Sequence, residues 1–201
     1  MITGQFNGEL LSRLVYNAEQ QSNNTDYNFS NTLSGGASVN SLNLTRVYIL
    51  TSSRTASASE MMINSLKEYI TVIQIGDTTV GKSQASLTIY DSPNFRRENV
   101  NPNHTYALQP LVAISVNKNN GEVPPTGLVP ETIFQLVESP VNFGTLGNPS
   151  EPLLARAVQH LSGNGRFSQP STIEMRQIES KVDFKPFEQD MYNDKETAPK
   201  L

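Results

Sequence analysis

The sequence has 201 residues, of which 36% are hydrophobic and 17% are charged, a composition typical of a soluble globular domain. Fifteen Lys and Arg residues against 19 Asp and Glu residues give a net charge of −4 without a basic cluster, so we expect no nucleic-acid partner. The lack of cysteine excludes a thiol nucleophile, and two histidines argue against a metal site. No apolar run approaches the roughly 20 residues of a membrane span. The available chemistry is that of Ser, Thr, Lys and carboxylates.

The N-terminal part of the chain predicts a helix followed by an irregular segment. Apolar residues recur at helical spacing between Gly8 and Gln21, which predicts an amphipathic helix. Residues 22–44 are rich in Asn, Ser, Thr and Gly, and this composition predicts a loop with at most a short strand near residues 27–29.

A strand–helix–strand unit is predicted next. The β-branched runs at residues 46–50 and 70–75 predict two strands, and residues 56–69 between them predict a helix. A helical crossover of this length joins parallel strands, so we expect the second strand to run parallel to the first. The unit indicates an α/β fold.

Further strands are predicted after this unit. Alternating polar and apolar residues at 85–90 and 106–116 predict two half-buried strands, the second interrupted by Pro110. Residues 132–137 predict one more short strand.

The last predicted element is a helix. It begins at Pro152, where a first helical turn tolerates proline, and Asn148 or Ser150 would cap it. The sequence is polar and aperiodic from residue 165 onward. We therefore predict a core over residues 1–164 and a polar tail over residues 165–201 that docks on the core through its aromatic side chains.

One loop matches a nucleotide-binding pattern. Residues 76–83, Gly-Asp-Thr-Thr-Val-Gly-Lys-Ser, have the spacing of a phosphate-binding loop and follow a predicted strand. Such a loop must open a helix whose amides and dipole hold the phosphates, whereas residues 84–90 predict a strand. An NTPase is therefore the least favoured interpretation.

A second pattern lies between the first strand of the unit and its helix, in residues 55–60, Thr-Ala-Ser-Ala-Ser-Glu. Ser57 would lie near the positive end of the helix, and the amide of Ala58 could point at an oxyanion. The alternative is that a serine only caps the helix while Glu60 favours its first turn. Lys82, in a glycine-flanked loop after the next strand, favours catalysis, because lysine acts as a base when desolvation lowers its pKa.

These patterns together resemble the C-terminal processing, or tail-specific, serine peptidases, whose core belongs to the ClpP/crotonase-like superfamily. The step of 25 residues from Ser57 to Lys82 is that of the family's nucleophile and lysine. Gly127-Leu-Val-Pro-Glu131 resembles a Gly-x-x-Pro-Asp segment of the family, and residues 146–155 resemble a segment of its Bacteroidetes-type members. The resemblance covers approximately residues 46–161.

The resemblance implies an α/β fold with a mixed sheet and packing helices, and a serine endopeptidase that needs no cofactor or metal. Carried over by position, Ser57 would be the nucleophile, Lys82 the general base, Glu60 a supporting carboxylate and the Ala58 amide an oxyanion donor. Ser86 stands where many members have Gln, and its hydroxyl would orient the lysine. The substrates implied are peptides and protein C-terminal tails in the cell envelope or periplasm.

Members of this family also have a PDZ domain and an upstream Gly-rich strand–loop that supplies a second oxyanion amide. Neither is found before Ser57. We therefore expect the chain to be the C-terminal part of a peptidase core, weakly active by itself. The alternative is a catalytically incompetent module of the same fold that binds C-terminal peptides.

Overall fold

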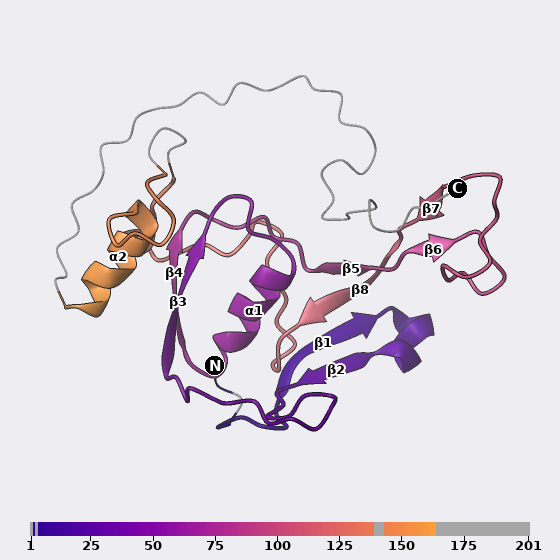
Figure 1. Cartoon of the computed structure of the whole chain (residues 1–201), viewed down its shortest axis with the longest axis horizontal. Coiled ribbons are helices and arrows are strands. Elements are labelled where there is room, and N and C mark those ends of the chain that lie inside the picture. Colours follow the sequence, from indigo (N-terminus) through magenta and orange to yellow (C-terminus); the bar gives the residue numbers. More distant parts are fainter. Residues whose placement is uncertain (1, 3, 139–142, 164–201) are drawn as a thin grey trace, which may run out of the picture. The chain divides into compact units, whose positions relative to one another are not determined.

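The structure, a computed structural model, describes residues 2, 4–138 and 143–163 (Figure 1). These residues all fall within one compact unit, Met1–Ser168. The tail predicted for residues 165–201 lies outside the described residues.

A parallel strand pair joined by a helix forms the centre of the fold (Figure 1). Strand β3 (Arg46–Thr51) pairs in parallel with β4 (Thr71–Gly76), and α1 (Ala58–Leu66) connects them, so the predicted unit is confirmed. Thr51 lies opposite Gly76 at the end of the pair. Because both strands end at the same edge, the turn into α1 and the loop after β4 begin side by side.

Both faces of this strand pair are packed, because alternate side chains of a strand point to opposite sides. One face joins the apolar clusters that contain Ile63 and Leu66 of α1, through Val47, Ile49 and Val72. The other face joins a cluster that contains Leu153 and Ala157 of α2 (Pro152–Leu161), through Tyr48, Ile73 and Ile75. The helices therefore cover opposite faces of the pair.

A four-stranded antiparallel sheet is the second main element. Its order is β2 (Thr25–Asn28), β1 (Leu10–Tyr16), β8 (Leu111–Val116) and β5 (Gln84–Ser86). Together with the parallel pair and its helices, it confirms the predicted α/β class.

The predicted helix over residues 8–21 is wrong. Residues 10–16 form the strand β1, followed by the 3₁₀ helix η1 (Ala18–Asn23). Arg13 pairs with Val116, about a hundred positions later, and the buried hydroxyl of Ser12 lies 2.9 Å from that of Ser115. Local spacing of apolar residues cannot reveal a strand partner so distant in sequence. Because β1 is paired on both edges, its backbone N–H and C=O groups form the hydrogen bonds that a helix would have formed internally.

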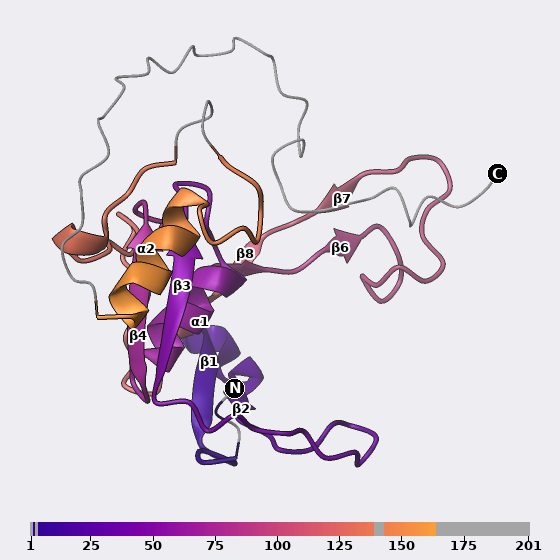
Figure 2. The same ribbon diagram turned by 60° about the vertical axis from the view of Figure 1, so that its left-hand side comes forward.

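The predicted strand over residues 85–90 is divided into β5 and β6 (Ile89–Tyr90). Its antiparallel partner is divided too, into β7 (Ala107–Leu108) and β8, as Pro110 predicts. Proline has no N–H for the ladder, although its carbonyl accepts the amide of Leu87 at 3.3 Å. The β6–β7 hairpin extends away from β8 in both views (Figures 1 and 2).

The predicted strand over residues 132–137 is also wrong. The segment begins with the 3₁₀ helix η2 (Thr132–Phe134). Only its end is extended, where Gln135 forms an isolated parallel bridge with Gly76 and the amide of Leu136 donates to the Gly76 carbonyl at 2.9 Å. This contact extends the sheet beside β4 by a single bridge.

The late helix α2 is confirmed, but its predicted caps are not. Glu151 caps it, accepting the amides of Leu153 at 3.0 Å and Leu154 at 2.7 Å. A carboxylate has two oxygens and can therefore bind both amides, whereas the side chain of Asn148 accepts the Ser150 amide at 2.9 Å.

We expect Glu151→Ala to lower the free energy of unfolding by about 1 kcal/mol, the usual effect of losing an N-cap. Ser150→Ala is the matched control and should have a smaller effect. Chemical denaturation of both variants measures the difference, and an equal loss in Ser150→Ala would show that the cap is misassigned.

Candidate active site

Ser57 lies at a strained turn between β3 and α1. Its φ of 56° and ψ of −116° place a residue with a side chain in a region that normally requires glycine, at a cost of about 1–3 kcal/mol. A strained strand-to-helix turn of this kind presents the nucleophilic serine in α/β hydrolases. Ala58 is exposed and begins α1, so its amide has no helical carbonyl one turn earlier. The turn can thus present a hydroxyl beside a free donor.

The segment before Ser57 is fixed to the loop that follows β4. The amide of Ser52 donates to Thr55 Oγ1 at 3.0 Å, and the Thr55 amide donates back to the Ser52 carbonyl at 2.9 Å. The Thr55 carbonyl then accepts the amide of Val80 at 2.9 Å. The two loops at this edge of the sheet are therefore joined through their backbones.

Glu60 is the second and stronger connection between these loops. Its side chain is completely buried. Oε2 accepts the amides of Ser57 and Lys82, each at 2.9 Å, and Oε1 accepts the amide of Gly81 at 2.6 Å and the hydroxyl of Thr79 at 2.5 Å. One carboxylate thus holds the backbone of both predicted catalytic residues.

The hydrogen bonds decide the charge of Glu60. Burial acts to raise the pKa of its carboxyl, but the bonds from Thr79, Gly81, Lys82 and Ser57 outweigh this effect and hold the pKa below its ordinary value. Glu60 is therefore ionised at neutral pH. With every partner donating to it, the carboxylate has the geometry of a positioning group.

Lys82 and Ser86 are less constrained. The amide of Lys82 is bound to Glu60, while its side chain is exposed. The preceding Gly81 has a φ of 86°, and a Cβ there would lie 2.3 Å from the Pro125 carbonyl oxygen, so this position requires glycine.

Ser86 is exposed at the end of β5, and its hydroxyl accepts a hydrogen bond from Gln109 Nε2 at 3.2 Å. Hydrogen bonds to Glu60 therefore join Ser57 and Lys82 through their amides, while the Ser86 hydroxyl is bonded to Gln109.

The same contacts rule out the phosphate-binding interpretation of residues 76–83. Two amides that such a loop would offer to a phosphate, those of Gly81 and Lys82, already donate to Glu60. Ser83 is buried and leads into strand β5 instead of opening a helix. The loop lacks the helix N-terminus that nucleotide binding requires.

Thr79 and Gln74 support the candidate site, although the sequence analysis did not predict a role for either residue. Gln74 is buried in β4, where its Nε2 donates to Thr51 Oγ1 at 3.2 Å and to the Leu128 carbonyl at 2.9 Å. Thr79 donates to Glu60 and accepts the Leu128 amide at 2.8 Å. A glutamine within a β-branched strand was the available signal for Gln74, because a polar residue at a buried position needs partners.

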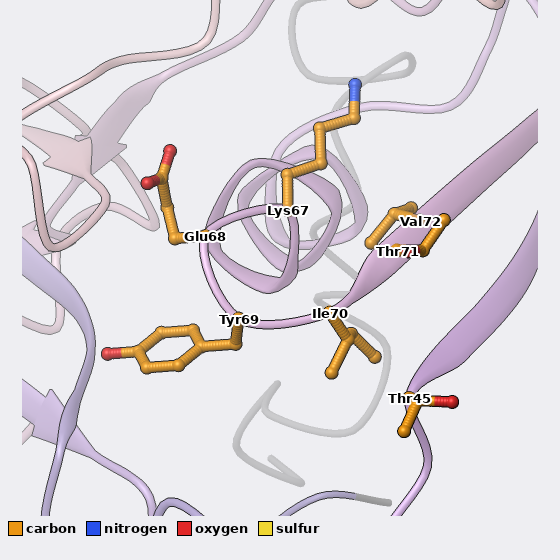
Figure 3. Close-up of a pocket in the computed structure, with 7 residues that line it drawn as sticks. All are labelled: Thr45, Lys67, Glu68, Tyr69, Ile70, Thr71 and Val72. Carbon is orange, nitrogen blue, oxygen red and sulfur yellow. The ribbon is translucent and has the colours of Figure 1, made fainter.

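Two hollows lie at opposite ends of the α1 connection. One, of about 340 Å³, is lined by Ser52 and Thr55 from the turn that leads to Ser57, and also by Leu153 of α2. The other, of about 540 Å³, lies after α1 and is lined by residues 67–72 and Thr45 (Figure 3). Its labelled polar side chains diverge, so it lacks convergent groups for a ligand. The first hollow is the one that adjoins the candidate site.

Within the described ranges, no group of three His, Asp or Glu side chains is placed to bind a metal ion. Neither α1 nor α2, the α-helices of that part of the chain, is long and apolar enough to cross a bilayer.

An α/β fold with a serine on a strained strand–helix turn, and a lysine on the adjoining loop, is the architecture expected of a serine hydrolase. Residues 4–92 match the model of peptidase family S41, a family of serine peptidases. This segment of the chain, which includes Ser57, Glu60 and Lys82, is similar to that family, and the resemblance to C-terminal processing peptidases is confirmed.

A solved structure supports the same fold. A Bacteroides fragilis protein assigned to the S41 proteases aligns with a TM-score of 0.65 and 27% identity over 82% of this chain. The chain spans 39% of that protein's length.

Two other structures align less well. A Streptococcus agalactiae lipoprotein has a TM-score of 0.48 and 16% identity, over 79% of this chain and 46% of its own. The photosystem II D1 C-terminal processing protease has a TM-score of 0.42 and 20% identity, over 64% of this chain and 27% of its own. Both TM-scores are too low to support an argument. No match was found among curated proteins.

The lowered pKa of Glu60 predicts a pH-dependent contribution to stability. The folded state binds its proton more weakly than the unfolded chain, so the contribution is complete above the ordinary value of 4.5 and is lost as pH falls through the lowered pKa. We therefore expect the difference in free energy of unfolding between wild type and Glu60→Gln to shrink below about pH 4.5. Chemical denaturation from pH 7 to pH 3 measures this difference, and one that stays constant or grows in acid would contradict the assignment.

Proposed function

We propose that this chain supplies the nucleophile and the general base of a serine endopeptidase that cleaves near protein C-termini. The observation that carries the proposal is the strained turn of Ser57, tied to the Lys82 loop through the buried carboxylate of Glu60. The S41 match of residues 4–92 supports the reaction class. Family resemblance favours substrates in the cell envelope or periplasm.

In the proposed reaction, the neutral amine of Lys82 takes the proton of the Ser57 hydroxyl as its oxygen attacks the scissile carbonyl carbon. The oxyanion that forms accepts the Ala58 amide, which is oriented by the first turn of α1. Collapse expels the amine of the leaving peptide, which receives the proton from Lys82, and leaves an acyl-enzyme on Ser57. Water activated by Lys82 then hydrolyses the ester.

This reaction requires a desolvated lysine, whereas the Lys82 side chain is exposed in the described structure. We propose that peptide bound across the turn and the loop covers this amine. Ser86, the last residue of β5, would then orient the amine in place of the glutamine of related enzymes. Glu60 would position both loops without touching the substrate.

The exposure of Lys82 is also the observation that favours the second candidate function. A module that keeps the fold but leaves its lysine solvated would bind C-terminal peptides without cleaving them. The two functions differ in one property, the reactivity of the Ser57 hydroxyl.

A serine-directed fluorophosphonate probe tests this reactivity in the 201-residue chain. We expect Ser57→Ala to abolish labelling and Lys82→Ala to slow it by about a hundredfold or more, the usual contribution of a general base. The double variant should be no worse than Ser57→Ala, because a nucleophile and its base act as one unit. Glu60→Gln should cost less than either single change.

Ser59→Ala is the matched control, because Ser59 is an exposed serine two positions further along the same helix. It should label like wild type. Labelling that persists in Ser57→Ala would overturn the assignment of the nucleophile. A folded wild-type chain that is not labelled, yet binds a C-terminal peptide, would establish the binding module instead.

A further inference from the structure

The hydroxyl of Thr79 occupies a central position beneath the two catalytic loops. Thr79 is only 5% exposed, and its Oγ1 lies 2.5 Å from Glu60 Oε1 and 2.8 Å from the amide nitrogen of Leu128. Its own amide donates to the Leu128 carbonyl at 3.2 Å. Thr79 therefore connects Glu60 to a third segment, around residues 127–128.

The direction of these two hydrogen bonds follows from chemistry alone. A threonine hydroxyl has one proton, and a backbone N–H can only donate. Oγ1 must therefore accept from Leu128, which leaves its proton for Glu60 Oε1. The bond to Glu60 is available only while that oxygen is an acceptor, as in the ionised carboxylate.

The third segment is packed against Thr79 too closely to give way. Gly127 has a φ of 86°, and a Cβ at this position would lie 1.9 Å from the Thr79 carbonyl oxygen. The close contact between the two backbones therefore requires glycine at position 127. It keeps Leu128 near enough for its carbonyl to accept the Thr79 amide and for its amide to donate to the Thr79 hydroxyl. The Leu128 amide thus fixes the Thr79 hydroxyl, and this hydroxyl can in turn fix the Glu60 carboxylate.

We propose that Thr79 is a positioning residue of the active site, and that its hydroxyl sets the direction of the Glu60 carboxylate and thereby the relative placement of Ser57 and Lys82. The inference rests on the proposed function for its catalytic part. Oε1 of Glu60 has two donors, Thr79 and Gly81. Without the hydroxyl, the Gly81 amide alone would hold this oxygen, and the carboxylate could rotate away from the Ser57 and Lys82 amides.

Thr79→Val and Thr79→Ser separate the hydroxyl from the rest of the side chain. Valine keeps the shape and removes the hydroxyl, whereas serine keeps the hydroxyl and removes a methyl group. Thr78→Val is the matched control, since it removes a hydroxyl one residue away, outside the contacts of Glu60. All variants are made in the 201-residue chain.

The first measurement is the Glu60 carboxyl pKa by carbon NMR titration, a property that a merely structural residue would not move. We expect the wild-type value to lie below the ordinary 4.5 and to rise by about one pH unit in Thr79→Val, since one hydrogen bond to the ionised form is lost. Thr79→Ser and Thr78→Val should keep the wild-type value. A wild-type pKa at or above 4.5 would overturn the proposal even if Thr79→Val failed to fold.

The second measurement is the fluorophosphonate labelling rate of Ser57. We expect a loss of about tenfold in Thr79→Val and a rate within about threefold of wild type in Thr79→Ser, in line with the loss of one buried hydrogen bond. Wild-type labelling in Thr79→Val, or an equal loss in Thr79→Ser, would overturn the proposal. If wild type is not labelled at all, the proposed function fails, while the Glu60 titration still decides whether Thr79 orients the carboxylate.

Discussion

An ionised carboxylate that is completely buried must be stabilised by hydrogen bonds, and Glu60 imposes this constraint on everything around it. The ion pairs among the described residues, Arg13–Asp26 and His104–Asp91, do not include it. Its partners are three backbone amides and one hydroxyl, which come from two loops separated by more than 20 residues of sequence. Satisfying one charge therefore brings the Ser57 turn and the Lys82 loop together and helps offset the strain at Ser57.

The parallel strand pair makes this meeting possible. Because β3 and β4 run in the same direction and Thr51 lies opposite Gly76, the two loops leave the sheet at one edge. Gln74 of β4 strengthens this edge, because its side-chain amide donates to both Thr51 and Leu128. Helices α1 and α2 pack on the two faces of the strand pair, so the strand ends that carry both loops belong to the packed core.

The parts of the fold that local pattern determines could be predicted, and the parts that depend on distant partners could not. The strand–helix–strand unit follows from two β-branched runs and one helical run. β1 was mistaken for a helix because its pairing with β8 is invisible to a local window. At the site, Ser57 and Lys82 were indicated by their local motifs and by the resemblance to C-terminal processing peptidases. The partners of Glu60 were not, because the same glycine-rich loop amides suit a phosphate and a carboxylate equally, and only the fold decides between them.

Amide hydrogen exchange measured by NMR tests most directly whether Glu60 holds the two loops together. In wild type at neutral pH, the amides of Ser57, Gly81 and Lys82 should exchange at least about a hundredfold more slowly than the amide of Gly35, which lies in an open part of the chain. In folded Glu60→Gln this protection should fall at all three positions together. Exchange as fast as that of Gly35 in wild type, or protection unchanged in Glu60→Gln, would contradict the account.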